Sequence, residues 1–188
     1  MSKDKKTNIE KVFQELQSKG LIDKKSKLIK NSSESNFRNL GKKIYYNPIF
    51  ANINRDSLRY ILLHEEAHNK QFQNSTWIFL TGLILAIPGV CFLKSFLITV
   101  ISFFIPFVVF KKLIWKDEFN ADLWSAERLN KFYKIKHPSK IMKDCIKEYK
   151  KIKEKRDLIR KIITYISKIM DLHPPYEERV KFVKKKIG

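Results

Sequence analysis

The chain of 188 residues is long enough for one domain of ordinary size and short for two. Lysine and arginine outnumber aspartate and glutamate by 39 to 19, which gives a formal net charge of +20. This balance favours contact with a polyanion, either nucleic acid or an anionic lipid surface. The sequence has no basic stretch interleaved with aromatics, no glycine-rich signature and no helix-turn-helix signature, so we expect no specific nucleic-acid partner.

The first expected element is a short amphipathic helix over residues 7–19. Its apolar residues recur at helical spacing and it stops at Gly20; they are Ile9, Val12, Phe13 and Leu16. The polar, Ser/Asn-rich stretch that follows predicts a loop or an irregular ribbon. We therefore expect an N-terminal region, residues 1–40, and a main domain, residues 41–188. The charged N-terminus lacks the apolar core of a signal peptide, which predicts a cytosolic N-terminal part.

A strand and the most informative helix come next. Ile44, Tyr45 and Tyr46 favour extended structure, and the Asn47-Pro48 pair ends it. Asp56-Ser57 then offers an N-cap for the helix LRYILLHEEAHNKQF. Its expected buried stripe consists of Leu58, Ile61, Leu62, Ala67 and Phe72.

Residues 77–110 carry Lys94 as their only charged side chain. A single membrane span takes about 20 residues, so this stretch predicts a transmembrane helical hairpin of two short spans. Its tip lies either at Lys94-Ser95 or at Pro88-Gly89. A buried hairpin in a soluble core is the alternative. The basic flanks put both ends in the cytoplasm, as expected for a multi-pass protein of the cytoplasmic membrane.

The remaining chain reads as helical. We expect one helix around DEFNADLWSAERLNKFYK, a long one from Lys140 to Met170, a break at the prolines 174–175, and a final helix YEERVKFVKKK. The isolated Cys91 and Cys145 predict neither a disulfide framework nor a CxxC metal pair.

The sequence HEEAH at 64–68 places His64 and His68 one helical turn apart, so both imidazoles can reach one metal ion. Glu65 then projects beside an open coordination position. This arrangement is typical of zinc hydrolases, in which an adjacent carboxylate takes the proton of the attacking water. Two surface histidines on a polar helix face are the alternative.

A catalytic zinc site needs a third protein ligand. After residues 77–110 the first carboxylates are Asp117, Glu118 and Asp122, of which Glu118 and Asp122 lie at i and i+4 and can face the same direction. We expect Glu118 to complete the ligand set for one Zn²⁺ per chain. We expect Asp122 to accept the free ring N–H of a ligating histidine.

Three stretches resemble the HtpX-like and CAAX-prenyl-protease-type membrane zinc metallopeptidases: YYNPIFANINRDSLRYILLHEEAH, EFNAD and HPPYEERV. The resemblance covers roughly residues 42–184, including two apolar segments between the motifs. That family usually has additional spans before its HExxH motif, and residues 1–57 contain none.

The resemblance implies a mainly α, integral-membrane zincin-like fold with a small β-sheet near the HExxH helix. It implies a zinc endopeptidase that cleaves membrane or membrane-proximal proteins at the cytoplasmic face, with a lipid bilayer and protein or peptide substrates as partners. Within the site, it implies that His173 or Arg179 helps to hold the substrate or the transition state. Two other functions stay open: a regulatory sensor-type metalloprotease, and a non-catalytic membrane adaptor that retains a metal site.

Overall fold

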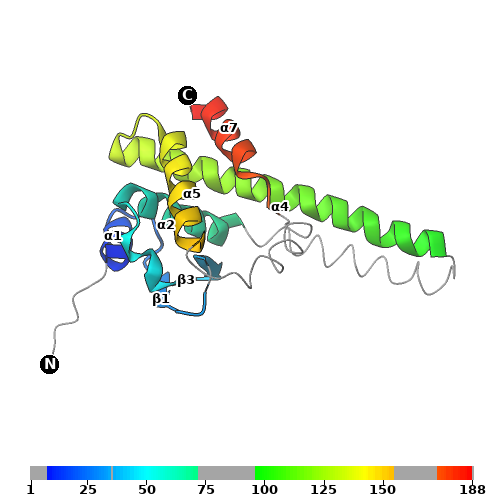
Figure 1. Ribbon diagram of the computed structural model, residues 1–188, viewed down its shortest axis with the longest axis horizontal. Coiled ribbons are helices and arrows are strands. Elements are labelled where there is room, and N and C mark those ends of the chain that lie inside the picture. Colours follow the sequence, from blue (N-terminus) through cyan, green and yellow to red (C-terminus); the bar gives the residue numbers. More distant parts are fainter. Residues whose placement is uncertain (1–7, 35, 72–95, 155–172, 188) are drawn as a thin grey trace.

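The computed structural model describes residues 8–34, 36–71, 96–154 and 173–187 (Figure 1). The described part is mainly helical and contains one small sheet. Its elements are α1 (Asn8–Ser18), β1 (Lys27–Lys30), β2 (Arg38–Leu40), β3 (Lys43–Tyr46), the 3-10 helix η1 (Pro48–Asn52), α2 (Arg55–Gln71), α4 (Phe96–Tyr133), α5 (Pro138–Glu154) and α7 (Tyr176–Ile187).

The N-terminal helix has the expected register. All four apolar residues of its stripe are buried, and Gly20 follows the helix with a φ of 68°. A positive φ is easily adopted only by glycine, which allows the chain to reverse after the helix. The chain turns so sharply there that the Leu21 N–H donates to the Leu16 carbonyl at 2.9 Å.

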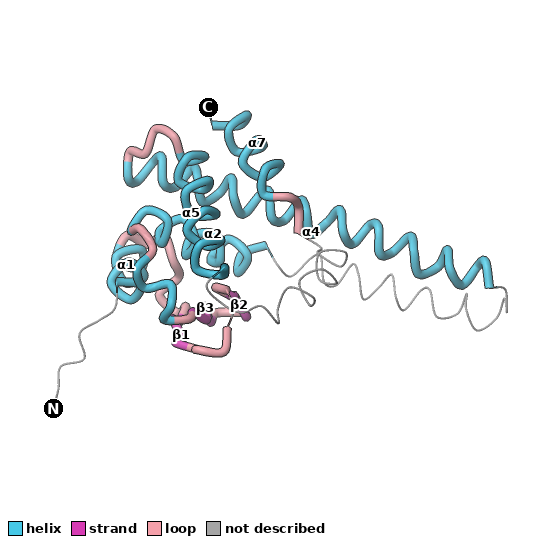
Figure 2. The backbone as a smooth tube through the Cα atoms, viewed as in Figure 1, coloured by secondary structure: helices cyan, strands magenta, loops and turns pink. Residues whose placement is uncertain are grey.

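The sheet has three strands in the order β1-β3-β2 (Figure 2). β1 pairs parallel to β3, and β2 pairs antiparallel to β3 through a two-residue turn in which Gly41 has a φ of 63°. The polar stretch expected to be a loop thus supplies β1 and β2. The expected boundary between residues 40 and 41 falls in the turn between the paired strands β2 and β3. Tyr46, on the central strand, is buried in the core.

α2 is the central helix, packed against α1, α4, α5 and the β2–β3 hairpin. Its N-cap is Asn54 rather than the expected Asp56-Ser57, because the Asn54 side chain accepts the Asp56 N–H at 2.9 Å. Since α2 contacts neighbours on several sides, its buried face is wider than one stripe. It includes the expected Leu58, Ile61, Leu62 and Ala67 and also Tyr60 and Leu63. Phe72 lies outside the described residues.

α4 is a single 38-residue helix that replaces part of the expected hairpin. Residues 96–110 form its beginning and run without a break into a segment with Lys111, Lys112 and Lys116, while residues 77–95 lie outside the described residues. Figure 1 shows this N-terminal part of α4 extending away from the other described elements.

Among the helices of the described residues, none combines the length with the apolar character that a membrane span requires. The expected integral-membrane fold with a transmembrane hairpin over 77–110 is therefore corrected, and so is the expected multi-pass location in the cytoplasmic membrane. The prediction failed because it treated 77–110 as a separate unit, whereas residues 96–110 belong to the same helix as Glu118.

Candidate metal centre

Two histidines on α2 face the same point. Their Nε2 atoms are 3.0 Å apart, and their rings stand nearly perpendicular, with centroids at 4.6 Å. The α-helical spacing of His64 and His68 produces this arrangement, since residues four apart lie on one face. Neither ring is freely exposed: 12% of the His64 side chain and 17% of the His68 side chain is accessible.

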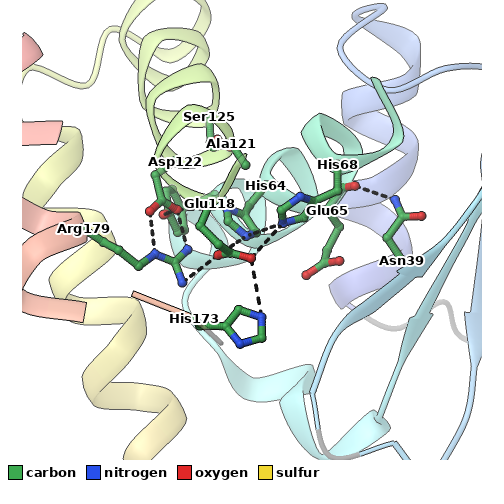
Figure 3. A network of polar contacts seen from close by, with 11 residues as sticks. Asn39, His64, Glu65, His68, Glu118, Ala121, Asp122, Ser125, His173 and Arg179 are labelled. Carbon is green, nitrogen blue, oxygen red and sulfur yellow. Dashed lines mark hydrogen bonds and ion pairs between the residues drawn. The ribbon is translucent and has the colours of Figure 1, made fainter. Parts of the chain in front are cut away.

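Glu118 on α4 lies opposite the histidine pair (Figure 3). Its Oε2 is 3.5 Å from His64 Nε2, and its Oε1 is 3.4 Å from His68 Nε2. In the described part of the chain, these three residues form the one group of potential metal ligands whose donor atoms all lie within 4.8 Å of one another. Tetrahedral ligands about 2.0–2.1 Å from a zinc ion are separated by roughly 3.3–3.4 Å. The spacing of the three donors fits such an ion.

The pKa values of Glu118 and His64 depend on the charged groups packed around them. Burial alone would raise the pKa of Glu118, but the two histidines and the charge of Arg179 hold it well below its usual range. Burial alone would lower the pKa of His64, but its contacts with Asp122 and Glu118 raise it to about 10. A metal ion that binds His64 Nε2 must therefore displace a proton, as metal binding to imidazole generally requires.

Asp122, one turn further along α4, lies behind the histidine pair and is fully buried. Its Oδ1 is 2.9 Å from His64 Nδ1, the ring nitrogen that faces away from His68. A carboxylate at Nδ1 leaves Nε2 available to a metal, but Nδ1 is not aligned to donate a hydrogen bond to Asp122. The expectation that Asp122 accepts the ring N–H stays a prediction. Burial acts to raise the pKa of Asp122, but the charge of Arg179 and the hydrogen bonds that Arg179 donates lower it.

Arg179 on α7 joins the two carboxylates of α4. Its Nε and Nη2 donate to the two oxygens of Asp122 at 2.6 Å each, and its Nη1 is 3.0 Å from Glu118 Oε2. Only 9% of its side chain is exposed. The guanidinium is thus fully engaged in orienting carboxylates and has little surface left for a substrate.

The two glutamates of HEEAH have different surroundings. Glu65 is half-buried, and burial raises the pKa of its carboxylate, with further contributions of both signs from nearby histidines and Glu118. Glu66 is 1% exposed, and its carboxylate accepts hydrogen bonds from the Asp23 N–H at 3.1 Å and the Ser26 hydroxyl at 3.2 Å. Glu66 therefore holds the segment before β1, and of the two glutamates only Glu65 lies beside the three potential ligands.

His173 precedes α7 and lies near Glu118. Its Nε2 is 3.6 Å from Glu118 Oε1, and 60% of its side chain is exposed. In the view of Figure 3, the Glu65 carboxylate and the His173 ring lie on the same side of the three potential ligands. The structure thus brings together all seven residues that the sequence singled out.

Sequence reasoning missed two residues that contact this group. Tyr60, one turn before His64, donates its hydroxyl to Asp122 Oδ1. Asn39 on β2 donates its side-chain amide to the Glu65 carbonyl at 2.5 Å and so ties an edge strand to α2. The i, i+4 spacing of Tyr60 and His64 is the one sequence signal that could have indicated the first contact, and no local pattern indicates the second.

Comparisons of the chain with protein families, with curated proteins and with solved structures found no match.

Proposed function

We propose that this protein is a zinc-dependent endopeptidase that hydrolyses peptide bonds of protein or peptide substrates. The observation that carries the proposal is the convergence of His64, His68 and Glu118, with donor atoms within 4.8 Å of one another, beside Glu65. Two imidazoles and one carboxylate form a ligand set of catalytic zinc sites, in which a fourth position is left to water.

Zinc bound there would lower the pKa of a water molecule and polarise the substrate carbonyl. Glu65 accepts the proton of the attacking water and returns it to the leaving amine. His173, whose ring is largely exposed, donates a hydrogen bond to the oxygen of the substrate carbonyl as negative charge develops there. Between His173 and Arg179, the geometry favours His173 for this role because Arg179 is buried against Asp122 and Glu118.

The two glutamates of α2 provide the test. Glu65→Gln should retain one zinc per chain and reduce cleavage of an unfolded protein substrate by roughly 100-fold or more, because the general base is lost. Glu66→Gln makes the same chemical change one residue away. It should retain the turnover of the folded protein and lower thermal stability, because Glu66 holds the segment from Asp23 to Ser26.

Metal content and cleavage rate are measured on the same purified samples. Undiminished cleavage by Glu65→Gln would refute the hydrolytic role of this site. Zinc binding by the wild type without any cleavage would favour the non-catalytic alternative, a protein that retains a metal site for another purpose.

A further inference from the structure

Tyr60 is buried beside the candidate metal centre, although nothing in the HEEAH pattern requires a tyrosine there. It is 5% exposed, and its ring centroid is 6.2 Å from that of His64. The two residues are one turn apart on α2 and both are directed at α4. The Tyr60 hydroxyl donates to Asp122 Oδ1, the oxygen that also faces His64 Nδ1.

Groups from α2 and α7 surround the Asp122 carboxylate. Oδ1 faces the Tyr60 hydroxyl, His64 Nδ1 at 2.9 Å and Arg179 Nη2 at 2.6 Å, while Oδ2 accepts from Arg179 Nε at 2.6 Å. A rotation of the carboxylate that moved Oδ1 away from His64 would also break its contacts with Tyr60 and Arg179. Because Asp122 is fully buried, water cannot replace those contacts.

Tyr60 and Arg179, which both donate hydrogen bonds to Asp122, belong to different helices. Arg179 comes from α7, whereas Tyr60 belongs to α2, the helix that also carries His64. The Tyr60 hydroxyl therefore links Asp122 directly to the helix that carries the His64 ring. This link does not depend on how α7 is attached. Phenylalanine at position 60 would fill the same space, but Asp122 would then keep only its hydrogen bonds from Arg179.

We propose that Tyr60 is a positioning residue of the metal centre. Through Asp122 it fixes the orientation of the His64 ring, so that Nε2 points at the position shared with His68 and Glu118. The inference rests on the proposed function, because it requires a metal ion at that position.

Cobalt(II) substituted for zinc reports on ligand geometry through its visible absorption bands, without any need for catalysis. Tyr60→Phe should still bind one cobalt per chain, because all three ligands remain. Its affinity should fall by roughly 10-fold, at the lower end of the effects seen when groups that orient ligands are removed. Its absorption bands should also differ from those of the wild type, since the His64 ring is less constrained.

Tyr149→Phe is the matched control. Tyr149 on α5 accepts a hydrogen bond from the Phe37 N–H at 3.3 Å and stacks on Phe50. Within the described part of the chain, it forms no hydrogen bond or ring contact with Asp122, His64 or His68. The Tyr149→Phe variant also lacks one buried tyrosine hydroxyl. It should therefore lose stability but keep the cobalt affinity and spectrum of the wild type.

A double-mutant cycle with Asp122→Asn tests the route of the effect. If Tyr60 acts through Asp122, Tyr60→Phe should change cobalt affinity less in the Asp122→Asn background than in the wild type. Equal affinity and spectrum in Tyr60→Phe, Tyr149→Phe and the wild type would overturn the inference while leaving the metal site intact. Absence of cobalt binding by the folded wild type would instead refute the proposed function, and this inference with it.

Discussion

Glu118 is the residue that links the two helices of the candidate centre, because its carboxylate faces His64 and His68 from the opposite helix. It is 6% exposed and also contacts Arg179, so its negative charge is maintained without a metal. Asp117, its neighbour on α4, points in another direction, since successive residues of a helix are about 100° apart. Asp117 has no donor atom in the group of three.

Replacement of these two carboxylates should therefore have different effects on metal content. We expect Glu118→Ala to lose stoichiometric zinc, because two histidines alone do not make a catalytic zinc site. Asp117→Ala should retain one zinc per chain. Elemental analysis of the two purified variants measures this, and Glu118→Gln repeats it with a side chain of unchanged size. Full zinc in both Glu118 variants would refute the assignment of this ligand.

Helix geometry alone placed several residues of the candidate centre before the fold was known. His64, Glu65 and His68 lie within one turn of a helix whose apolar pattern is strong, so their arrangement followed from helix geometry. Glu118 and Asp122 were placed by the same argument on a second helix. The ion pairs of Arg179 with both carboxylates depend instead on how α7 packs against α4, and no local pattern encodes that packing.

Among the elements, α1 contacts α2 through ion pairs of Glu15 with Arg55 and Arg59. Glu15 on α1 accepts hydrogen bonds from Arg59 at 2.8 Å and Arg55 at 2.7 Å, and its side chain is 17% exposed. Burial acts to raise the pKa of Glu15. The nearby Tyr133 hydroxyl, the hydrogen bond from Arg55 and the charge of Arg59 outweigh it and lower the pKa below the ordinary 4.5.

The lowered pKa predicts how this contribution depends on pH. The folded protein binds a proton at Glu15 more weakly than the unfolded chain, so the cluster contributes fully above pH 4.5 and loses its effect as pH falls through the folded pKa. Glu15→Gln should lower the free energy of unfolding by about 1–2 kcal/mol near neutral pH. The difference from the wild type should shrink in acid.

Urea unfolding of both proteins at neutral and acidic pH measures the difference. Glu177→Gln, which changes an exposed carboxylate at the start of α7, controls for the removal of one negative charge. A difference between Glu15→Gln and the wild type that stays constant with pH would contradict the proposed linkage.

Two elements were predicted wrongly because local composition does not show what a segment pairs with or continues into. The stretch that forms β1 and β2 is polar and lacks alternation, so nothing in it predicted strands. They form because β3 supplies backbone partners on both of its edges. In the same way, the apolar composition of residues 96–110 predicted a separate span. Composition alone did not reveal that these residues continue into the helix that carries Glu118.

At the scale of the whole molecule, the candidate centre joins elements that are distant in the sequence. Its ligands come from α2 and α4, and Arg179 connects the ligand Glu118 to α7. In the unfolded chain these side chains are not held together, so a metal ion that binds them binds mainly the folded protein. Such a ligand stabilises the folded state by mass action.

Zinc should therefore raise the free energy of unfolding of the wild type by about 4 kcal/mol when its free concentration exceeds the dissociation constant about 1,000-fold. Thermal unfolding with buffered zinc and with a chelator measures the change. Asp117→Ala should show the same stabilisation, because its ligand set is intact, whereas Glu118→Gln should show little. An equal increase in Tm for Glu118→Gln and the wild type would mean that zinc binds elsewhere, and the bridge between α2 and α4 would not be the metal site.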